Sequence, residues 1–113
     1  MQFKTQKVEN VTVMMIEGKL LAEQETSKVK DHITGELGSG QQKFIFDLKG
    51  IEFVNSACLN FLVSSKNLIA TKNGSLVLCN VPDQLHKLLM VTKLDAFFTT
   101  AGRTAEAVEM LRL

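Results

Sequence analysis

The stretch Phe44–Phe61, FIFDLKGIEFVNSACLNF, decides the fold of this chain. Its apolar start, Phe44–Leu48, is typical of a central strand that is covered on both faces. A connection over Lys49–Val54 then leads to a helix that begins near Ser56. A helix that starts directly after a buried strand leaves free backbone N–H groups and the positive end of its dipole at the surface. The stretch therefore predicts a strand–helix unit whose junction can hold an anion or a partner.

Length and composition predict one globular domain over residues 1–113. Hydrophobic residues make up 45% of the chain and charged residues 22%, which is enough apolar material for a packed core. The net charge is +1, and no block of Lys and Arg points to a nucleic acid. No apolar run reaches the roughly 18 residues of a membrane-spanning helix, and the N-terminus lacks an apolar signal core. We therefore expect a soluble, cytoplasmic protein with no membrane insertion and no nucleic-acid partner.

Hydrophobic periodicity divides the chain into alternating strands and helices. Ahead of the central stretch, the sequence predicts strands over Phe3–Val8 and Val11–Ile16 and a helix over Ala22–Leu37 with the apolar stripe Thr26, Val29, Ile33 and Leu37. From the central stretch onward, it predicts a helix over Ser56–Thr71, a strand over Ser75–Cys79, a helix over Pro82–Met90, a strand near Phe97–Thr99 and a helix from Thr104.

This order predicts an α/β fold. Alternating strands and helices favour a mostly parallel central sheet of about five strands with about four helices and right-handed crossovers. The two N-terminal strands are joined by a tight turn at Glu9-Asn10, so they form a hairpin that supplies one antiparallel edge strand.

The central stretch resembles the STAS domain of bacterial anti-sigma factor antagonists. That family has an apolar strand ending in Asp-Leu, a short apolar crossover, and Asp-Ser-Ser-Gly-Leu-Gly at a helix start. The corresponding segments here are FIFDL (44–48), EFV (52–54) and NSACLN (55–60). EGKL (17–20), NGSLVL (73–78) and LLMVTKLDAFF (88–98) match further family segments in the same order. The resemblance covers almost the whole chain and implies a STAS-like fold.

The resemblance also implies a function. In the family, an anti-sigma factor that is also a serine kinase phosphorylates the second Ser of the motif, and the unphosphorylated antagonist binds that anti-sigma factor and frees the sigma factor. Phosphate adds about 1.5–2 negative charges and weakens or reorganises the contact. The implied role is therefore that of a regulatory binding protein without catalytic residues or cofactors, which acts on transcription through an anti-sigma factor or another STAS-binding protein.

The motif is degenerate at the site itself. Asn55 replaces the Asp, Ala57 replaces the Ser that accepts phosphate, Cys58 replaces the first Gly and Asn60 the second. Leu21 stands where the family often has an acidic residue. The usual phosphoserine switch is therefore predicted to be lost. Ser56, one residue earlier, is the remaining candidate acceptor, although it is a more natural N-cap.

The helix start is the predicted partner-binding surface. Asn55, Ser56, Ala57 and Asn60 are expected to form it, in addition to capping the helix. Phe61 and Leu68 lie off the predicted core stripe, which is traced by Leu59, Leu62, Val63, Lys66, Ile69 and Ala70. We expect Phe61 to be exposed and to contact the partner. The alternative is that a wide helix face buries it.

Other reactive side chains favour structural roles. Cys58 at a helix start could carry a lowered thiol pKa or pair transiently with Cys79, but core filling is the favoured interpretation. His32 and His86 stand alone, so no metal site is predicted. Asp47 is expected to bond the backbone after its strand rather than to act in catalysis.

Three alternatives stay open. The chain could be an accessory or scaffold subunit of a membrane lipid transporter or of a stressosome-like assembly, for which loss of the acceptor Ser is expected. It could instead bind a small ligand or nucleotide at the helix N-terminus. The edge strand and an exposed Phe61 also leave room for a homodimer.

Overall fold

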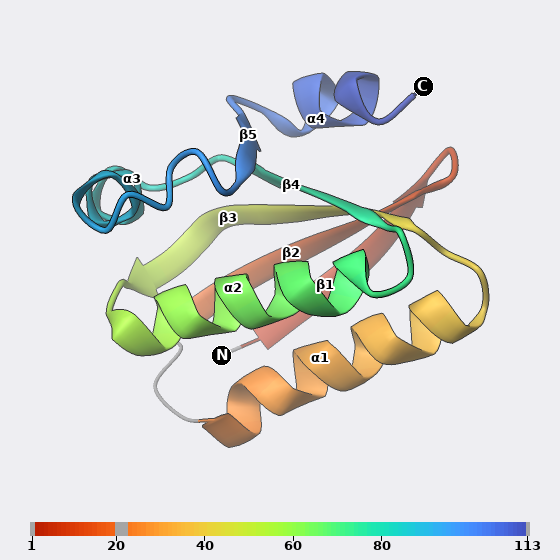
Figure 1. The fold of residues 1–113 in the computed structure, drawn as a ribbon, viewed down its shortest axis with the longest axis horizontal. Helices are drawn as coiled ribbons and strands as arrows, with labels where there is room; N and C mark the ends of the chain where they lie inside the picture. Colours follow the sequence, from red (N-terminus) through yellow and green to blue (C-terminus); the bar gives the residue numbers. More distant parts are fainter. Residues whose placement is uncertain (1, 20–22, 113) are drawn as a thin grey trace.

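The computed structural model describes residues 2–19 and 23–112, and it contains five strands and four helices within these ranges (Figure 1). The elements are β1 (Gln2–Val8), β2 (Val11–Lys19), α1 (Glu23–Gly38), β3 (Lys43–Phe53), α2 (Ser56–Ala70), β4 (Ser75–Cys79), α3 (Asp83–Val91), β5 (Thr99–Ala101) and α4 (Thr104–Met110). Their order confirms the predicted alternation of strands and helices.

The strands form one sheet in the order β1-β2-β3-β4-β5. β1 runs antiparallel to β2, and every other neighbouring pair is parallel. This arrangement confirms the predicted α/β fold with a mostly parallel sheet and one antiparallel edge strand. Helices α1 and α2 lie side by side on one face of the sheet, and α4 lies on the opposite face (Figure 1).

Alternating side chains of the central strands build two separate cores. Phe44 and Phe46 of β3 belong to the larger core, beneath α1, α2 and α3. Ile45, between them, points to the other face and packs with Ala107 and Val108 of α4. All three strand residues are fully buried, as expected for a strand covered on both faces.

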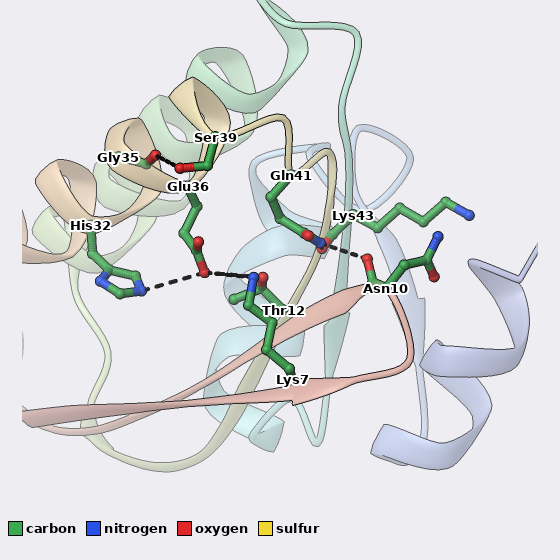
Figure 2. Close-up of polar contacts among 9 residues, drawn as sticks. All are labelled: Lys7, Asn10, Thr12, His32, Gly35, Glu36, Ser39, Gln41 and Lys43. Atoms are coloured by element: carbon green, nitrogen blue, oxygen red, sulfur yellow. Dashed lines mark hydrogen bonds and ion pairs between the residues drawn. The ribbon is translucent and has the colours of Figure 1, made fainter.

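The predicted stripe of α1 is confirmed, because Thr26, Val29, Ile33 and Leu37 are all buried. On the side of the hairpin, Glu36 accepts a bond from Lys7 Nζ at 3.0 Å and from Thr12 Oγ1 at 3.3 Å (Figure 2). These contacts fasten α1 to β1 and β2. The predicted start of α1 at Ala22 lies outside the described residues, as does Leu21.

The predicted limits of three strands, β2, β3 and β5, are wrong. β3 does not end at Leu48 but continues to Phe53, because β2 also continues past Ile16 and pairs with it there. This second half follows a register shift between Met15 and Glu17. β5 spans Thr99–Ala101 rather than Phe97–Thr99, since Phe98 is buried in the larger core before the strand begins.

The predicted buried stripe of α2 is only partly right. Leu62 and Ile69 are buried as expected, but Cys58, Phe61 and Ser65 complete the stripe. The predicted members Leu59, Val63 and Lys66 are half-buried, and Ala70 is exposed. The stripe is rotated because α2 packs against α1 and the sheet, which turns Phe61 inward.

The end of α2 follows the predicted stop signal. Asn73 takes a left-handed conformation with φ 58°, and the Gly74 N–H donates to the Ile69 carbonyl at 3.0 Å. This geometry is common where a helix ends. Within the described ranges, no helix has the length and apolar character to cross a membrane.

Candidate functional site

The start of α2 is held by Asn55. Its backbone is extended, with φ −147° and ψ −173°, and its Oδ1 accepts a bond from the Cys58 N–H at 3.0 Å. Asn55 therefore provides the expected cap, and Ser56, the other residue expected to cap the helix, does not. Ser56 is the first helical residue and is exposed.

The predicted partner-binding residues divide into surface and core. Ser56 and Asn60 are exposed, and Asn55 and Ala57 are half-buried. Asn55, Ser56 and Ala57 lie at the start of α2, where β3 leads into the helix at one end of the molecule, and Asn60 follows in the next turn (Figure 1).

Phe61 does not belong to this surface. Its side chain is only 2% exposed, and its ring stacks on that of Phe46 with centroids 5.8 Å apart and planes 6° from parallel. The expectation of an exposed Phe61 is therefore wrong, and a contact with a partner in solution would require it to leave the core. Leu68, its expected neighbour in an apolar patch, packs against the same core.

A groove lies directly beside the helix start, between α2 and α3. Its volume is about 470 Å³, and its apolar lining comes from Val54, Leu59, Leu88 and Val91. Asn55 and Ser56 form part of its wall, so the groove continues the surface at the helix start. Val91 is the most open of the apolar residues, because 80% of its surface is exposed.

The groove carries little charge. Lys87 is the charged residue in its lining, and Gln84 and Thr92 complete the polar part. The sequence does contain a signal for this groove. The run Leu88-Leu89-Met90-Val91 offers more apolar side chains than one face of a short helix can bury, and Leu89 alone of these four lies in the core.

Cys58 is a core residue rather than a reactive thiol. It is fully buried, and the loss of solvation raises its thiol pKa to about 11. Burial likewise raises the pKa of Cys79, whose Sγ lies 3.4 Å from Thr104 Oγ1. Cys58 belongs to the core beneath α2 and Cys79 to the core beneath α4. The sheet separates the two thiols, so the prediction that they could form a transient disulfide is wrong.

Asp47 has the structural role expected for it. Its Oδ1 accepts bonds from the Lys49 N–H and from Asn80 Nδ2, both at 3.1 Å. It thus fixes the irregular part of β3 and the loop after β4. In residues 2–19 and 23–112, no three His, Cys, Asp or Glu side chains converge as metal ligands.

The sequence matches the STAS domain family over residues 2–107. No match is found among curated proteins. Among solved structures, the Thermotoga maritima protein TM1081, proposed to be an anti-sigma factor antagonist, superposes with a TM-score of 0.84 at 23% identity. The alignment covers 98% of this chain and 95% of that chain.

Two further structures have the same fold. The anti-sigma factor antagonist SpoIIAA of Bacillus, in its unphosphorylated form, gives a TM-score of 0.80 at 17% identity, over 98% of this chain and 96% of that chain. A chain of the stressosome, a signal integration and transduction hub, gives 0.77 at 20% identity, over 97% and 100%. The family match spans nearly the whole sequence and the architecture agrees with it, so this chain belongs to the STAS domain family.

Proposed function

We propose that this chain is a single STAS domain over residues 1–113 that acts as a regulatory binding protein of the anti-sigma factor antagonist type, without enzymatic activity. Its partner is an anti-sigma factor with a serine-kinase-like domain, and binding regulates transcription in the cytoplasm. One observation carries the proposal: the apolar groove opens directly beside Asn55 and Ser56, at the helix start where the family resemblance places partner contact.

The groove suits a protein partner better than a small ion. Burial of apolar surface contributes about 25 cal/mol per Å², and interfaces depend on a few central apolar anchors with a polar rim. Leu59, Leu88 and Val91 provide such a centre, and Asn55 and Ser56 provide the rim. Because Lys87 is the charge in this lining, we expect a partner segment with apolar side chains flanked by an acidic residue.

Ala57 removes the family's phosphate acceptor from this surface. It is half-buried on the first turn of α2 and has no hydroxyl group. Binding would then be constitutive or controlled through the partner, in contrast to SpoIIAA, which is known in phosphorylated and unphosphorylated forms. Ser56 is the hydroxyl still exposed at this helix start, and it is the position at which a residual phosphorylation would occur.

Two observations disfavour an enzyme or nucleotide binder. The reactive candidates Cys58 and Asp47 are buried or engaged in structural bonds. In addition, the strand order follows the chain order from β1 to β5. Open parallel sheets bind nucleotides in the crevice where the strand order reverses, and this sheet has no such reversal.

Partner capture from native lysate tests the proposal. Tagged wild-type protein is expected to retain an anti-sigma factor with a kinase-like domain, identified by mass spectrometry. After incubation of the complex with ATP, the intact mass of the wild-type chain should not change, whereas Ala57→Ser should gain one phosphate. Recovery of no such anti-sigma factor would contradict the proposed function, and phosphate on the wild-type chain would contradict the lost switch.

The second candidate is a constitutive scaffold subunit, either in a stressosome-like assembly or in a membrane lipid transporter. The missing acceptor hydroxyl at Ala57 and the similarity to a stressosome chain favour it. The same capture distinguishes the two functions, because a scaffold subunit would retain other STAS proteins or a transporter ATPase and no anti-sigma factor.

A further inference from the structure

β1 is a long and regular edge strand. All seven of its residues pair with β2, from Gln2↔Glu17 to Val8↔Val11, without a register shift. Its outer side has no neighbouring strand among the described residues, whereas the opposite edge strand β5 has only three residues. Proteins usually protect edges with short strands, prolines, bulges or charges. β1 has neither a proline nor a bulge, and its protection is limited to the charges of Lys4 and Lys7. Its backbone is therefore open to pairing in a register that keeps these lysines from facing one another.

The hairpin turn determines which backbone groups point outward. Val8 and Val11 flank the two-residue turn Glu9-Asn10 and therefore form a hydrogen-bonded pair. Pairs alternate along an antiparallel ladder, so the even-numbered residues of β1 bond to β2. The N–H and C=O groups of Phe3, Thr5 and Lys7 consequently face away from the sheet.

We propose that β1 pairs antiparallel with β1 of a second copy of this chain, about a two-fold axis at Thr5. In this register Thr5 faces the second copy's Thr5, and Phe3 faces the second copy's Lys7. All outward groups are then satisfied, in about six backbone hydrogen bonds. The sheets of the two copies join into one continuous sheet.

Charge selects this register. With the axis at Thr5, Lys4 faces the second copy's Gln6 and Lys7 faces Phe3, so no two lysines oppose each other. An axis at Lys4 would place two lysines directly opposite, which is unfavourable in a sheet. A Thr–Thr pair at the centre is favourable in the same setting.

Within each copy, two side-chain contacts leave the outer edge of β1 accessible. Lys7 Nζ lies 3.0 Å from Glu36 Oε1, so its charge is compensated by α1 (Figure 2). The Phe3 ring packs edge-on against His32, with centroids 5.7 Å apart. Both side chains are thus drawn toward α1 and away from an incoming strand. The contact area is small, so we expect a weak dimer that depends on concentration.

This surface is separate from the one at the start of α2, because β1 lies at the outer edge of the sheet and α2 connects its third and fourth strands. A dimer would therefore leave both docking grooves open and present two of them together, which raises the apparent affinity for a partner with paired sites.

Sedimentation equilibrium of the purified full chain tests the pairing. From roughly 10 µM to 1 mM, the range expected for a small interface, the average mass should rise from 12.5 kDa toward twice that value. Thr5→Pro removes one outward N–H and leaves the bonds to β2, so it should stay monomeric with an unchanged melting temperature. Thr5→Val keeps the N–H and should dimerise like the wild type.

Cysteine crosslinking tests the register independently. Both native cysteines are buried, so Thr5→Cys introduces an exposed thiol that lies opposite itself across the two-fold axis. It should form a disulfide-linked dimer on oxidation, and Lys4→Cys should not. A wild type that stays monomeric at 1 mM would overturn the proposal. So would a dimer that survives Thr5→Pro, or equal crosslinking of the two cysteine variants.

Discussion

At the scale of single residues, Asn55 shows how the helix start keeps its structure while its motif changes. An Asp or an Asn at an N-cap provides the same side-chain oxygen, and here Asn55 Oδ1 accepts the Cys58 N–H. An Asp would add a negative charge near the positive end of the helix dipole, worth about 0.3–1 kcal/mol. The chain therefore keeps the cap and loses only the charge.

We expect Asn55→Ala to lower the free energy of unfolding by about 1 kcal/mol, because the Cys58 N–H loses its acceptor. Asn55→Asp should be as stable as the wild type or slightly more stable. Urea unfolding of the three proteins at neutral pH measures both differences. If Asn55→Ala unfolds at the same urea concentration as the wild type, the assigned cap is wrong.

The buried Cys58 thiol makes stability depend on alkaline pH. Its pKa is raised from 9.0 to about 11 in the folded state, so between these values the unfolded chain releases a proton that the folded chain retains. Stability from this group is complete below pH 9 and is lost as the pH rises to about 11, on the order of 2–3 kcal/mol in total.

Urea unfolding at a series of pH values between 8 and 11 checks this expectation, with Cys58→Ala as the reference. The reference lacks the thiol and should show a shallower loss of stability over the same range. Equal pH dependence of the two proteins would show that Cys58 ionises normally in the folded state.

At the scale of elements, close contact between β2 and β3 explains the glycine in the middle of β3. A Cβ atom at Gly50 would lie 2.5 Å from the Cβ of Glu17, its partner in the sheet. The second half of β3 therefore needs glycine at this position, where the register has just shifted. Gly35 of α1 differs, since an added Cβ there meets nothing within 4 Å.

The two glycines form a matched pair for a stability test. Gly50→Ala should lower the free energy of unfolding by about 1–3 kcal/mol, as overpacking does. Gly35→Ala should raise it by about 0.5–1 kcal/mol, because alanine favours a helix. Thermal unfolding followed by circular dichroism measures both. A Gly50→Ala protein as stable as the wild type would show that the strands separate here without cost.

Sequence patterns predicted which strands and helices exist more accurately than where each one begins and ends. The apolar run Phe44–Leu48 identified the central strand. Lys49 and Gly50 interrupt the apolar pattern, so the second half of β3 was not predicted. This half forms because it pairs with β2. Helical spacing located α2 but not its buried side. Phe61 turns inward because Phe46 provides a stacking partner on the sheet, and periodicity along one helix contains no information about that neighbour.

At the scale of the whole molecule, chain order and sheet order coincide, so the topology could be predicted from the alternation of elements. The helix start at Asn55 could be located in the same way. The groove beside it could not, because it forms only where Leu59 of α2 and Leu88 and Val91 of α3 come together in three dimensions. Individual residue patterns do not specify that packing.

The groove beside the start of α2 is the proposed binding site for the partner. Val91 is 80% exposed in this groove, and Met110 of α4, on the other face of the sheet, is 43% exposed and outside it. Val91→Asp places a charge in the apolar groove, and Met110→Asp places the same charge on an unrelated surface. Both positions are exposed, so both variants should fold like the wild type.

Isothermal titration of the captured anti-sigma factor with the wild type and these two variants is the most direct measurement. We predict that Val91→Asp weakens binding at least about tenfold, equivalent to about 1.4 kcal/mol, and that Met110→Asp binds like the wild type. Unchanged affinity of a folded Val91→Asp, or an equal loss in both variants, would contradict the assignment of the groove as the docking site.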